Sequence, residues 1–528
     1  MRAFFAFVPV ALIALTVISF SWIFGGTLPD KLLWPIPWVS ALTLETLLFF
    51  PQRIPGETQY EACARCWKGL VRDPLSWITM VFFVLLAIPF FNKGICLDCE
   101  YDAVFQKFLL SEWSSITDPV QYAPIFKDLA APPLPYSPMC FDLLEHRTVV
   151  MWFIPAFIAM LAARHALTRH GKRQLVETLA WNGAVLAVIG FVQMATDAPG
   201  PWWEPMDVAG QFFSTFGYAN MAASFFVLMM ALSIAVWRTR IGEVRAMRKA
   251  REAEAHSASG ARRGPGWIRA HYALIPATLN FFGALGTLSR AGIIFAGVLA
   301  VLAFLYSIGA LFVQGASRQR KVANIKRMVA YSVGAIIFIV GVMIFAPKGI
   351  DKEFSGTSSV SVADRVTNRD EAYARAAWAV FKDHPIWGVG GWGYRHACLD
   401  KLPEKMSKGF RLGQGVGWAN VHNDYLQFMC EHGAVGFALI LAAFAALIWP
   451  LARAWHQLGK LVRFMKAEHR PPHPRAIYCL PPGALWILVG SICVLVHALG
   501  DCPLRSPAVL SALLVSLAST EGFLPRED

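Results

Sequence analysis

The chain is dominated by long apolar runs that are separated by short polar segments. Hydrophobic residues make up 56% of its 528 positions, and charged residues only 16%. A helix needs about 20 consecutive apolar residues to cross the hydrocarbon core of a bilayer. Twelve runs approach that length: 3–25, 32–51, 75–92, 148–167, 175–196, 214–237, 271–288, 290–313, 329–347, 433–453, 483–500 and 504–521. The pattern therefore predicts an all-α polytopic membrane protein with about twelve transmembrane helices.

Lys and Arg are concentrated in alternate connecting segments. Segments 238–270 and 314–328 are rich in both residue types, whereas segment 197–213 has neither. Cytoplasmic loops of membrane proteins carry the excess of positive charge. We therefore expect both termini to be cytoplasmic and the long loops 93–147 and 348–432 to face the other side. The net charge of +13 resides largely in such loops, so it does not indicate nucleic-acid binding.

The runs divide the chain into three parts. Residues 1–347 hold nine predicted spans, together with the outer loop 93–147 and the basic loop 238–270, and residues 433–528 hold the last three. Between them, the loop 348–432 is expected to be partly helical. Thr367–Asp370 is close to a capping box, and Pro385 ends the helix that follows it. Tyr373, Ala376, Ala377, Val380 and Phe381 mark one face of that helix.

Ten cysteines are too few to define a disulfide scaffold in a chain of this length. Cys96, Cys99 and Cys140 all lie in the outer loop 93–147, where a disulfide would persist. Whether any two of them pair is left open by the sequence.

One polar stretch, Gly415–Gly436, leads directly into an apolar run. From Asn420 onward the spacing of His422, Leu426 and Met429 predicts a short helix, and Gly433 is expected to end it in the left-handed conformation. His422 would then lie where a long loop re-enters the membrane. An imidazole in that position can accept a proton near neutral pH. The spacing fits equally a histidine that caps or packs an interfacial helix.

Four short motifs resemble those of the O-antigen ligase and polymerase family. The main one is His422–Leu426 followed by Glu431–Gly436. Asp383–Trp392 resembles the family's His-Pro block, and Leu288–Gly292 resembles its Ser-Arg-Ala/Gly turn. Phe216–Ala223 resembles its Gly/Asn-rich entry to a helix. The motifs follow the family's order along the chain, whereas the first 200 residues show no such resemblance.

The resemblance implies a membrane glycosyltransferase of the bacterial inner membrane. Such enzymes move a glycan from undecaprenyl diphosphate to an acceptor at the periplasmic face, and they use no cofactor. The implied partners are the lipid-linked glycan, membrane lipids, and an acceptor that is a glycolipid such as lipid A-core or a glycan chain. Ligases, polymerases and protein O-oligosaccharyltransferases share these motifs, so the acceptor stays open.

The resemblance also implies roles for individual residues. His422 is expected to be the catalytic base, and Arg290 is expected to bind the carrier's diphosphate, although its position also fits an interfacial anchor. Arg365 and Arg369 are secondary diphosphate ligands. The chain departs from the ligase pattern because segment 197–219 contains no arginine. Further candidates for substrate binding, each of which could instead pack the core, are Asn220, Trp392, Asn423, Tyr425 and Glu431.

The outer loops contain no D-x-D pair of the kind that holds a divalent cation, so we expect metal-independent transfer. A transporter of lipid-linked glycans has the same number of spans. Transporters commonly consist of two repeated halves and carry ionisable groups within the membrane. This sequence shows no repeated halves and has few intramembrane charges. A haem-handling protein is disfavoured because the Trp-rich loop lacks a matched pair of axial ligands.

Overall fold

A computed structural model describes residues 2–26, 35–92, 95–96, 129–130, 134, 136–140, 143–205, 212–255, 271–312, 329, 333–334, 371–398, 401–403, 420–467 and 480–524. Most of the predicted span 329–347 lies outside these residues, as do Arg365, Arg369 and Cys99. Cys140 is buried, and its thiol donates a hydrogen bond to the Pro89 carbonyl (3.5 Å). A disulfide among the outer-loop cysteines stays a prediction.

The described residues are almost entirely helical. Their helices are α1 (Arg2–Trp22), α3 (Pro35–Leu48), α4 (Gln59–Arg72), α5 (Pro74–Ala87), α7 (Leu143–His165), α8 (Arg169–Ala195), α9 (Ala219–Ala255), α11 (Leu274–Gly286), α12 (Arg290–Phe312), α16 (Glu371–Asp383), α17 (Tyr394–Ala397), α19 (Asp424–Ala467), α20 (Pro482–His497) and α21 (Pro507–Ala518). Two short strands, β1 (Ile95–Cys96) and β2 (Leu129–Ala130), pair in antiparallel fashion. The predicted all-α class is confirmed.

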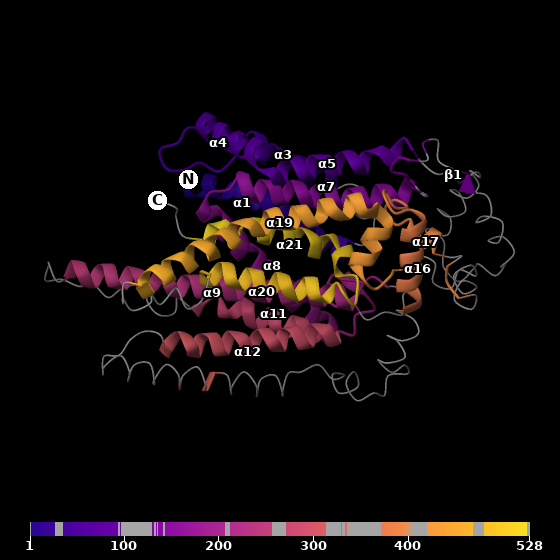
Figure 1. Ribbon diagram of the computed structural model, residues 1–528. Coiled ribbons are helices and arrows are strands. Elements are labelled where there is room, and N and C mark those ends of the chain that lie inside the picture. The colour runs from indigo at the N-terminus through magenta and orange to yellow at the C-terminus, as the bar shows by residue number, and fades with distance from the viewer. Residues whose placement is uncertain are drawn as a thin grey trace.

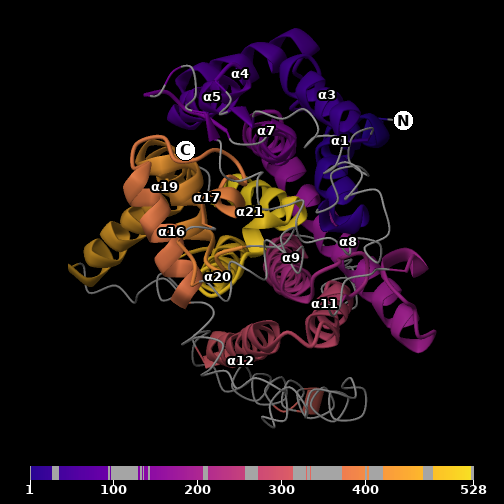
Figure 2. The same ribbon diagram turned by 90° about the vertical axis from the view of Figure 1, so that its right-hand side faces the viewer.

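The long helices run side by side in both directions along one axis (Figure 1). At one end, which we call the motif end, α1, α8, α11 and α20 stop and α9, α12, α19 and α21 start. Helices α16 and α17 lie over this end (Figures 1 and 2). The opposite end, which we call the basic end, carries Arg164, Lys172 and Arg240. Both chain termini lie at the basic end (Figure 1).

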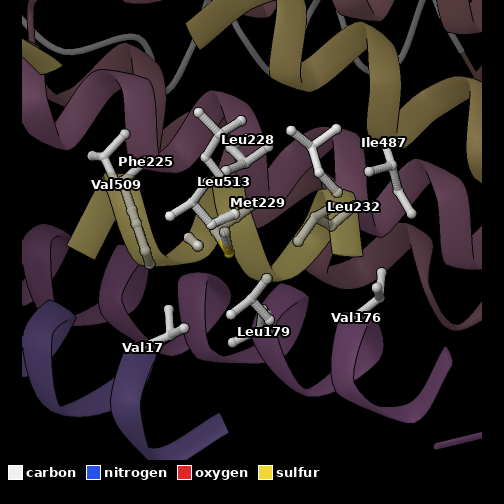
Figure 3. Close-up of a cluster of buried hydrophobic side chains, with 14 of the residues drawn as sticks. Val17, Val176, Leu179, Phe225, Leu228, Met229, Leu232, Ile487, Val509 and Leu513 are labelled. Carbon is white, nitrogen blue, oxygen red and sulfur yellow. The ribbon is translucent and has the colours of Figure 1, made fainter. Parts of the chain in front are cut away.

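Helix α9 forms the centre of the bundle. Every residue from Met221 to Arg238 is buried. Its large side chains pack between α1, α8, α20 and α21 (Figure 3). Small residues allow neighbouring backbones to approach closely: a Cβ atom added to Gly490 of α20 would lie 2.4 Å from the Cβ of Ala231. Such small-residue contacts are typical of helix packing in membranes.

Five helices are long and apolar enough to cross a membrane, namely α7, α8, α9, α12 and α19. The bent pair α4–α5 would add a sixth if it forms one broken span, and α1, α11, α20 and α21 contribute shorter apolar helices. The chain is therefore a multi-pass helical membrane protein. The figure of twelve spans stays a prediction.

Several predicted loops at the basic end are partly helical. The predicted spans 148–167 and 175–196 leave 168–174 as a connecting segment, but α8 already begins at Arg169, because the Thr168 hydroxyl caps it by accepting a hydrogen bond from the Gly171 amide (3.2 Å). Helix α9 continues to Ala255 and α19 to Ala467, so the basic segments that follow the predicted spans extend the same helices. Segment 52–74, which lies between two predicted spans, contains the amphipathic helix α4.

The predicted helix in the loop 348–432 is confirmed as α16. Ala376, Ala377 and Val380 form its buried face, as the spacing indicated, and Tyr373 and Phe381 pack beside them. They join a second, smaller hydrophobic core with residues of α17 and α19. This core holds α16 against the motif end of the bundle.

Candidate active site at the motif end

His422 lies immediately before α19, in an unusual backbone conformation. The predicted helix from Asn420 starts at Asp424, because Asn423 caps it: the Asn423 side-chain oxygen accepts a hydrogen bond from the Leu426 amide (3.0 Å). His422 has φ of +53°, in the left-handed region that non-glycine residues rarely adopt. Backbone strain of this kind is concentrated at functional sites.

The imidazole of His422 contacts the carboxylate of Asp501, which lies in the turn between α20 and α21. The Nδ1 atom is 3.3 Å from Oδ1 of Asp501. An ionised carboxylate only accepts hydrogen bonds, so Nδ1 of His422 is the donor in this contact. The His422 side chain is 17% exposed, which leaves it reachable from outside. The ring of Tyr373, from α16, lies 6.2 Å from the imidazole between centroids.

Asp501 is buried and held by donors from three further groups. The Tyr218 hydroxyl lies 3.2 Å from both carboxylate oxygens, the Asn220 amide donates to Oδ2, and the Cys502 amide donates to Oδ1 (2.7 Å). Burial raises the pKa of Asp501, but the hydrogen bond and charge of His422 outweigh it and lower that pKa to about 2. Burial and the charge of Asp501 raise the pKa of Tyr218, so its phenol stays a neutral donor.

These contacts bring two distant sequence motifs together. Asn220 begins the first turn of α9, and His422 precedes α19, yet both side chains meet the same carboxylate. Asn220 thus lies near His422, and its role in substrate binding stays a prediction. Asp501 was not among the predicted residues. The only sequence signal for it is an acidic residue in the short polar turn between the last two apolar runs.

Arg290 is the first residue of α12 and lies at the same end of the bundle. Ser289 caps this helix by accepting a hydrogen bond from the Gly292 amide (3.3 Å). Gly292 packs against Ala223 in the first turns of α9. One turn further along, the ring of Phe295 lies 5.9 Å from that of His497, four residues before Asp501. The start of α12 is thereby fixed beside the two elements that hold Asn220 and Asp501.

Glu431 points into a buried ion pair. Its carboxylate accepts hydrogen bonds from the Arg505 guanidinium (2.7 Å) and from the Gln427 amide (3.0 Å). Burial opposes the charge of Arg505, but Glu431 and Asp424 raise its pKa, so the guanidinium stays charged. The pair ties the first turns of α19 to the turn that carries Asp501. The Glu431 side chain is 0% exposed, so its contacts fit a role in packing the core rather than in binding substrate.

Three other predicted residues also make packing contacts. The Asn423 amide donates to the Leu499 carbonyl (3.1 Å), and the Tyr425 hydroxyl donates to the Leu495 carbonyl (2.8 Å). The Trp392 ring lies under the Arg395 guanidinium, whose central carbon is 3.6 Å from the ring centroid. A role of these residues in substrate binding stays a prediction.

The His-Pro block and the Glu431–Gly436 segment form one unit. Gly433 has φ of +64°, but its ψ of −174° lies outside the predicted left-handed helical region, and it kinks α19 rather than ending it. The kink exposes backbone groups that the His-Pro block satisfies: the Gly390 amide donates to the Glu431 carbonyl (2.8 Å), and the Ala434 amide donates to the Pro385 carbonyl (2.8 Å). A Cβ atom at Gly433 would lie 2.2 Å from the Ile386 carbonyl oxygen, so only glycine fits.

Among the described residues, one group has the composition of a metal site. His422, Asp501 and Cys502 bring donor atoms within 4.8 Å of one another. Both oxygens of Asp501 already accept hydrogen bonds, from His422 and Cys502 on one side and from Tyr218 and Asn220 on the other. A cation would have to replace these bonds, so the arrangement fits a histidine–carboxylate pair better than a metal centre.

The fold and site define a class: a multi-pass helical membrane protein with a histidine–carboxylate pair at one end of its bundle. Residues 275–441 match the family model described as O-antigen ligase. A general O-antigen ligase-like activity follows, in which a lipid-linked glycan is joined to an acceptor. No curated protein matches the chain.

The matched region contains both predicted catalytic residues, His422 and Arg290. It also contains the His-Pro block and the kink at Gly433. Asn220 and Asp501 lie outside it, on either side. The Asp501 carboxylate therefore contacts both His422, in the matched region, and Asn220, at the start of α9.

Proposed function

We propose that this protein transfers a glycan from undecaprenyl diphosphate to an acceptor at the periplasmic face of the bacterial inner membrane. The observation that carries the proposal is the contact between His422 and Asp501, which orients an imidazole at the end of the bundle where Arg290 begins α12. In this orientation the motif end faces the periplasm. The basic end, with both termini, faces the cytoplasm, in accord with the distribution of Lys and Arg.

His422 would act as the general base. Its Nε2 accepts the proton of an acceptor hydroxyl as that oxygen attacks C1 of the donor sugar. The bond between C1 and the diphosphate oxygen breaks, and the electron pair leaves with undecaprenyl diphosphate. Asp501 keeps the imidazole in the correct tautomer and stabilises the imidazolium that forms.

Arg290 would bind the diphosphate and stabilise the charge that develops as it leaves. A guanidinium matches phosphate oxygens geometrically and stays charged throughout. A fixed charge in a poorly hydrated site is worth more than the same charge in water. Arg365 and Arg369 remain candidates for the same task, and no metal ion is required by this scheme.

The polymerase alternative has one specific observation in its favour. Ligases of the family carry an arginine before the Asn-containing span, whereas here the residue that meets Asp501 from that segment is Tyr218, a neutral donor. A polymerase would extend a carrier-linked chain, and a protein O-oligosaccharyltransferase would use a protein hydroxyl. The chemistry at His422 is the same in all three.

The test is transfer by the purified protein in liposomes, with an undecaprenyl-diphosphate-linked glycan and a panel of glycolipid, glycan and protein acceptors. We expect His422→Ala to lower turnover by about 10²- to 10⁴-fold. The control is His456→Ala, which changes an exposed histidine of α19 near the basic end. A ladder of products would favour the polymerase, and a single product the ligase.

Three outcomes would contradict the proposal. Full activity of His422→Ala would show that His422 is not the catalytic base. Loss of activity with EDTA that manganese or magnesium restores would show that the transfer depends on a metal ion. Movement of intact donor across the membrane without cleavage at C1 would favour a transporter of lipid-linked glycans.

A further inference from the structure

Helix α4 lies across the edge of the bundle at the basic end (Figure 1). It meets α5 at Asp73, where the two helix axes are bent by 71°. Two contacts of Asp73 stabilise this corner between the helices. Asp73 caps α5 by accepting a hydrogen bond from the Leu75 amide (3.0 Å), and Arg164 of α7 forms an ion pair with the same carboxylate. When α5 crosses the bilayer, α4 therefore lies closer to the membrane plane than to the membrane normal.

One face of α4 packs on the protein. Ala62 and Cys66 are buried, and the Cys66 thiol donates a hydrogen bond to the Leu47 carbonyl of α3 (3.2 Å). A Cβ atom at Gly69 would lie 2.9 Å from the His165 ring of α7. The orientation of α4 around its own axis is thus fixed by its contacts with α3 and α7.

A second face of α4 is apolar and exposed. Tyr60, Trp67 and Val71 are 83%, 47% and 58% exposed, and their spacing of seven and four residues places them on one line along the helix. We call them the α4 stripe. Exposed apolar side chains continue on both sides, on α3 with Phe49 and Phe50 and on α5 with Trp77. Tyr and Trp are enriched where proteins cross the membrane–water interface.

The third face of α4 carries charge. Lys68 and Arg72 are exposed next to the α4 stripe, and Arg65 on the same flank pairs with Glu57 (2.9 Å). An apolar stripe beside a cationic flank is the pattern of a helix that lies in the headgroup region of a membrane. Anionic headgroups attract such a flank, whereas a second protein surface would need an acidic patch to complement it.

We propose that α4 is an interfacial helix that binds anionic phospholipids of the leaflet at the basic end. The α4 stripe sits at the boundary between headgroups and acyl chains, and Lys68 and Arg72 contact lipid phosphates. The corner at Asp73 holds the helix at this depth. This site is independent of the transfer chemistry at the motif end.

The first test is native mass spectrometry of the full chain released from bilayers that contain phosphatidylglycerol. Two lost contacts lower lipid affinity by about 10-fold or more, so we expect Lys68→Gln/Arg72→Gln to retain correspondingly less phosphatidylglycerol than wild type. The control is Arg375→Gln/Lys382→Gln, which removes the same charge from α16 at the motif end. Unchanged retention in the α4 variant, or an equal loss in the control, would overturn the proposal.

A second measurement distinguishes a lipid from a protein partner. A photoreactive benzoylphenylalanine placed at position 67, on the α4 stripe, is expected to give lipid adducts of the monomer in native membranes. Cross-linked dimers, or cross-links to another protein in place of lipid adducts, would show that a protein covers the stripe and would overturn the proposal.

Discussion

The two ends of the bundle hold their charges in different ways. At the basic end, permanent charges are neutralised in pairs that join separate helices: Lys172 binds Glu521 (2.6 Å), and Arg240 binds Glu177 (2.9 Å). At the motif end, beside the buried pair of Glu431 and Arg505, the Asp501 carboxylate is held by neutral donors and by the imidazole of His422. A paired permanent charge fixes helices in place, whereas a titratable group beside a held carboxylate can exchange a proton.

Backbone conformation shows the same contrast. The non-glycine residues with positive φ among the described positions all lie at the motif end: Phe24, Asp197, Trp202, Trp203, Ser214, Leu288, Trp392 and His422. Three of them, Leu288, Trp392 and His422, belong to the sequence motifs that resemble those of the family. The motif end therefore combines a buried supporting ion pair with a strained backbone around the candidate site.

The largest effect is expected from breaking the buried ion pair that supports the motif end. Arg505→Met leaves the Glu431 carboxylate buried without its cation, so the free energy of unfolding should fall by about 3–5 kcal/mol. Arg173→Met is the matched change at the basic end, where the pair with Glu243 is about one-third exposed and worth about 0–1 kcal/mol. Denaturant unfolding in detergent measures both. An equal fall in the free energy of unfolding for both variants would contradict the view that the buried pair contributes more to stability than the exposed one.

Arg290→Ala should come next, through activity rather than stability. Loss of a charge that stabilises the leaving diphosphate lowers turnover by about 10²- to 10³-fold, or about 3–4 kcal/mol. The control is Arg463→Ala, an exposed arginine of α19 near the basic end. The measurement is the steady-state transfer rate of both variants. Normal turnover with Arg290→Ala would indicate that Arg290 is an interfacial anchor rather than a diphosphate ligand.

Asp501→Asn should have a smaller effect and should change the pH dependence of stability. Turnover falls by about 10- to 100-fold, because the imidazole loses its orienting carboxylate. The pKa of Asp501 is about 2, below its unfolded value near 4, so its stabilising contribution is complete above pH 4 and is lost as the pH falls toward 2. Asp501→Asn should therefore lack the loss of stability that the wild type shows between about pH 4 and pH 2, as measured by denaturant unfolding. An equal acid loss in the variant would contradict this contribution of Asp501.

Much of the architecture could be predicted because its signals are local. Apolar runs predict the helices, and the spacing of Ala376, Ala377 and Val380 predicts the buried face of α16. The motif around His422 predicts the site residue. Boundaries were less predictable, because capping by Thr168 depends on a residue that carries no apolar period.

The missing parts of the site depend on contacts across the chain. Asp501 is 79 residues from His422 and 281 from Asn220, so no local pattern joins them. The pair between Glu431 and Arg505 likewise links residues 74 positions apart. Helix α4 was not predicted, because its sequence alternates polar and apolar residues and contains no long apolar run, so it resembles the sequence of a basic loop.

The central claim is that Asp501 acts through His422, and a double-mutant cycle tests it most directly. Transfer rates are compared for His422→Ala, Asp501→Asn and the double variant under the conditions that give full wild-type activity. We predict that the double variant is no slower than His422→Ala alone, within about a factor of 3, because residues that act as a unit are not additive. Losses that multiply would show that the two side chains act separately and would contradict the account.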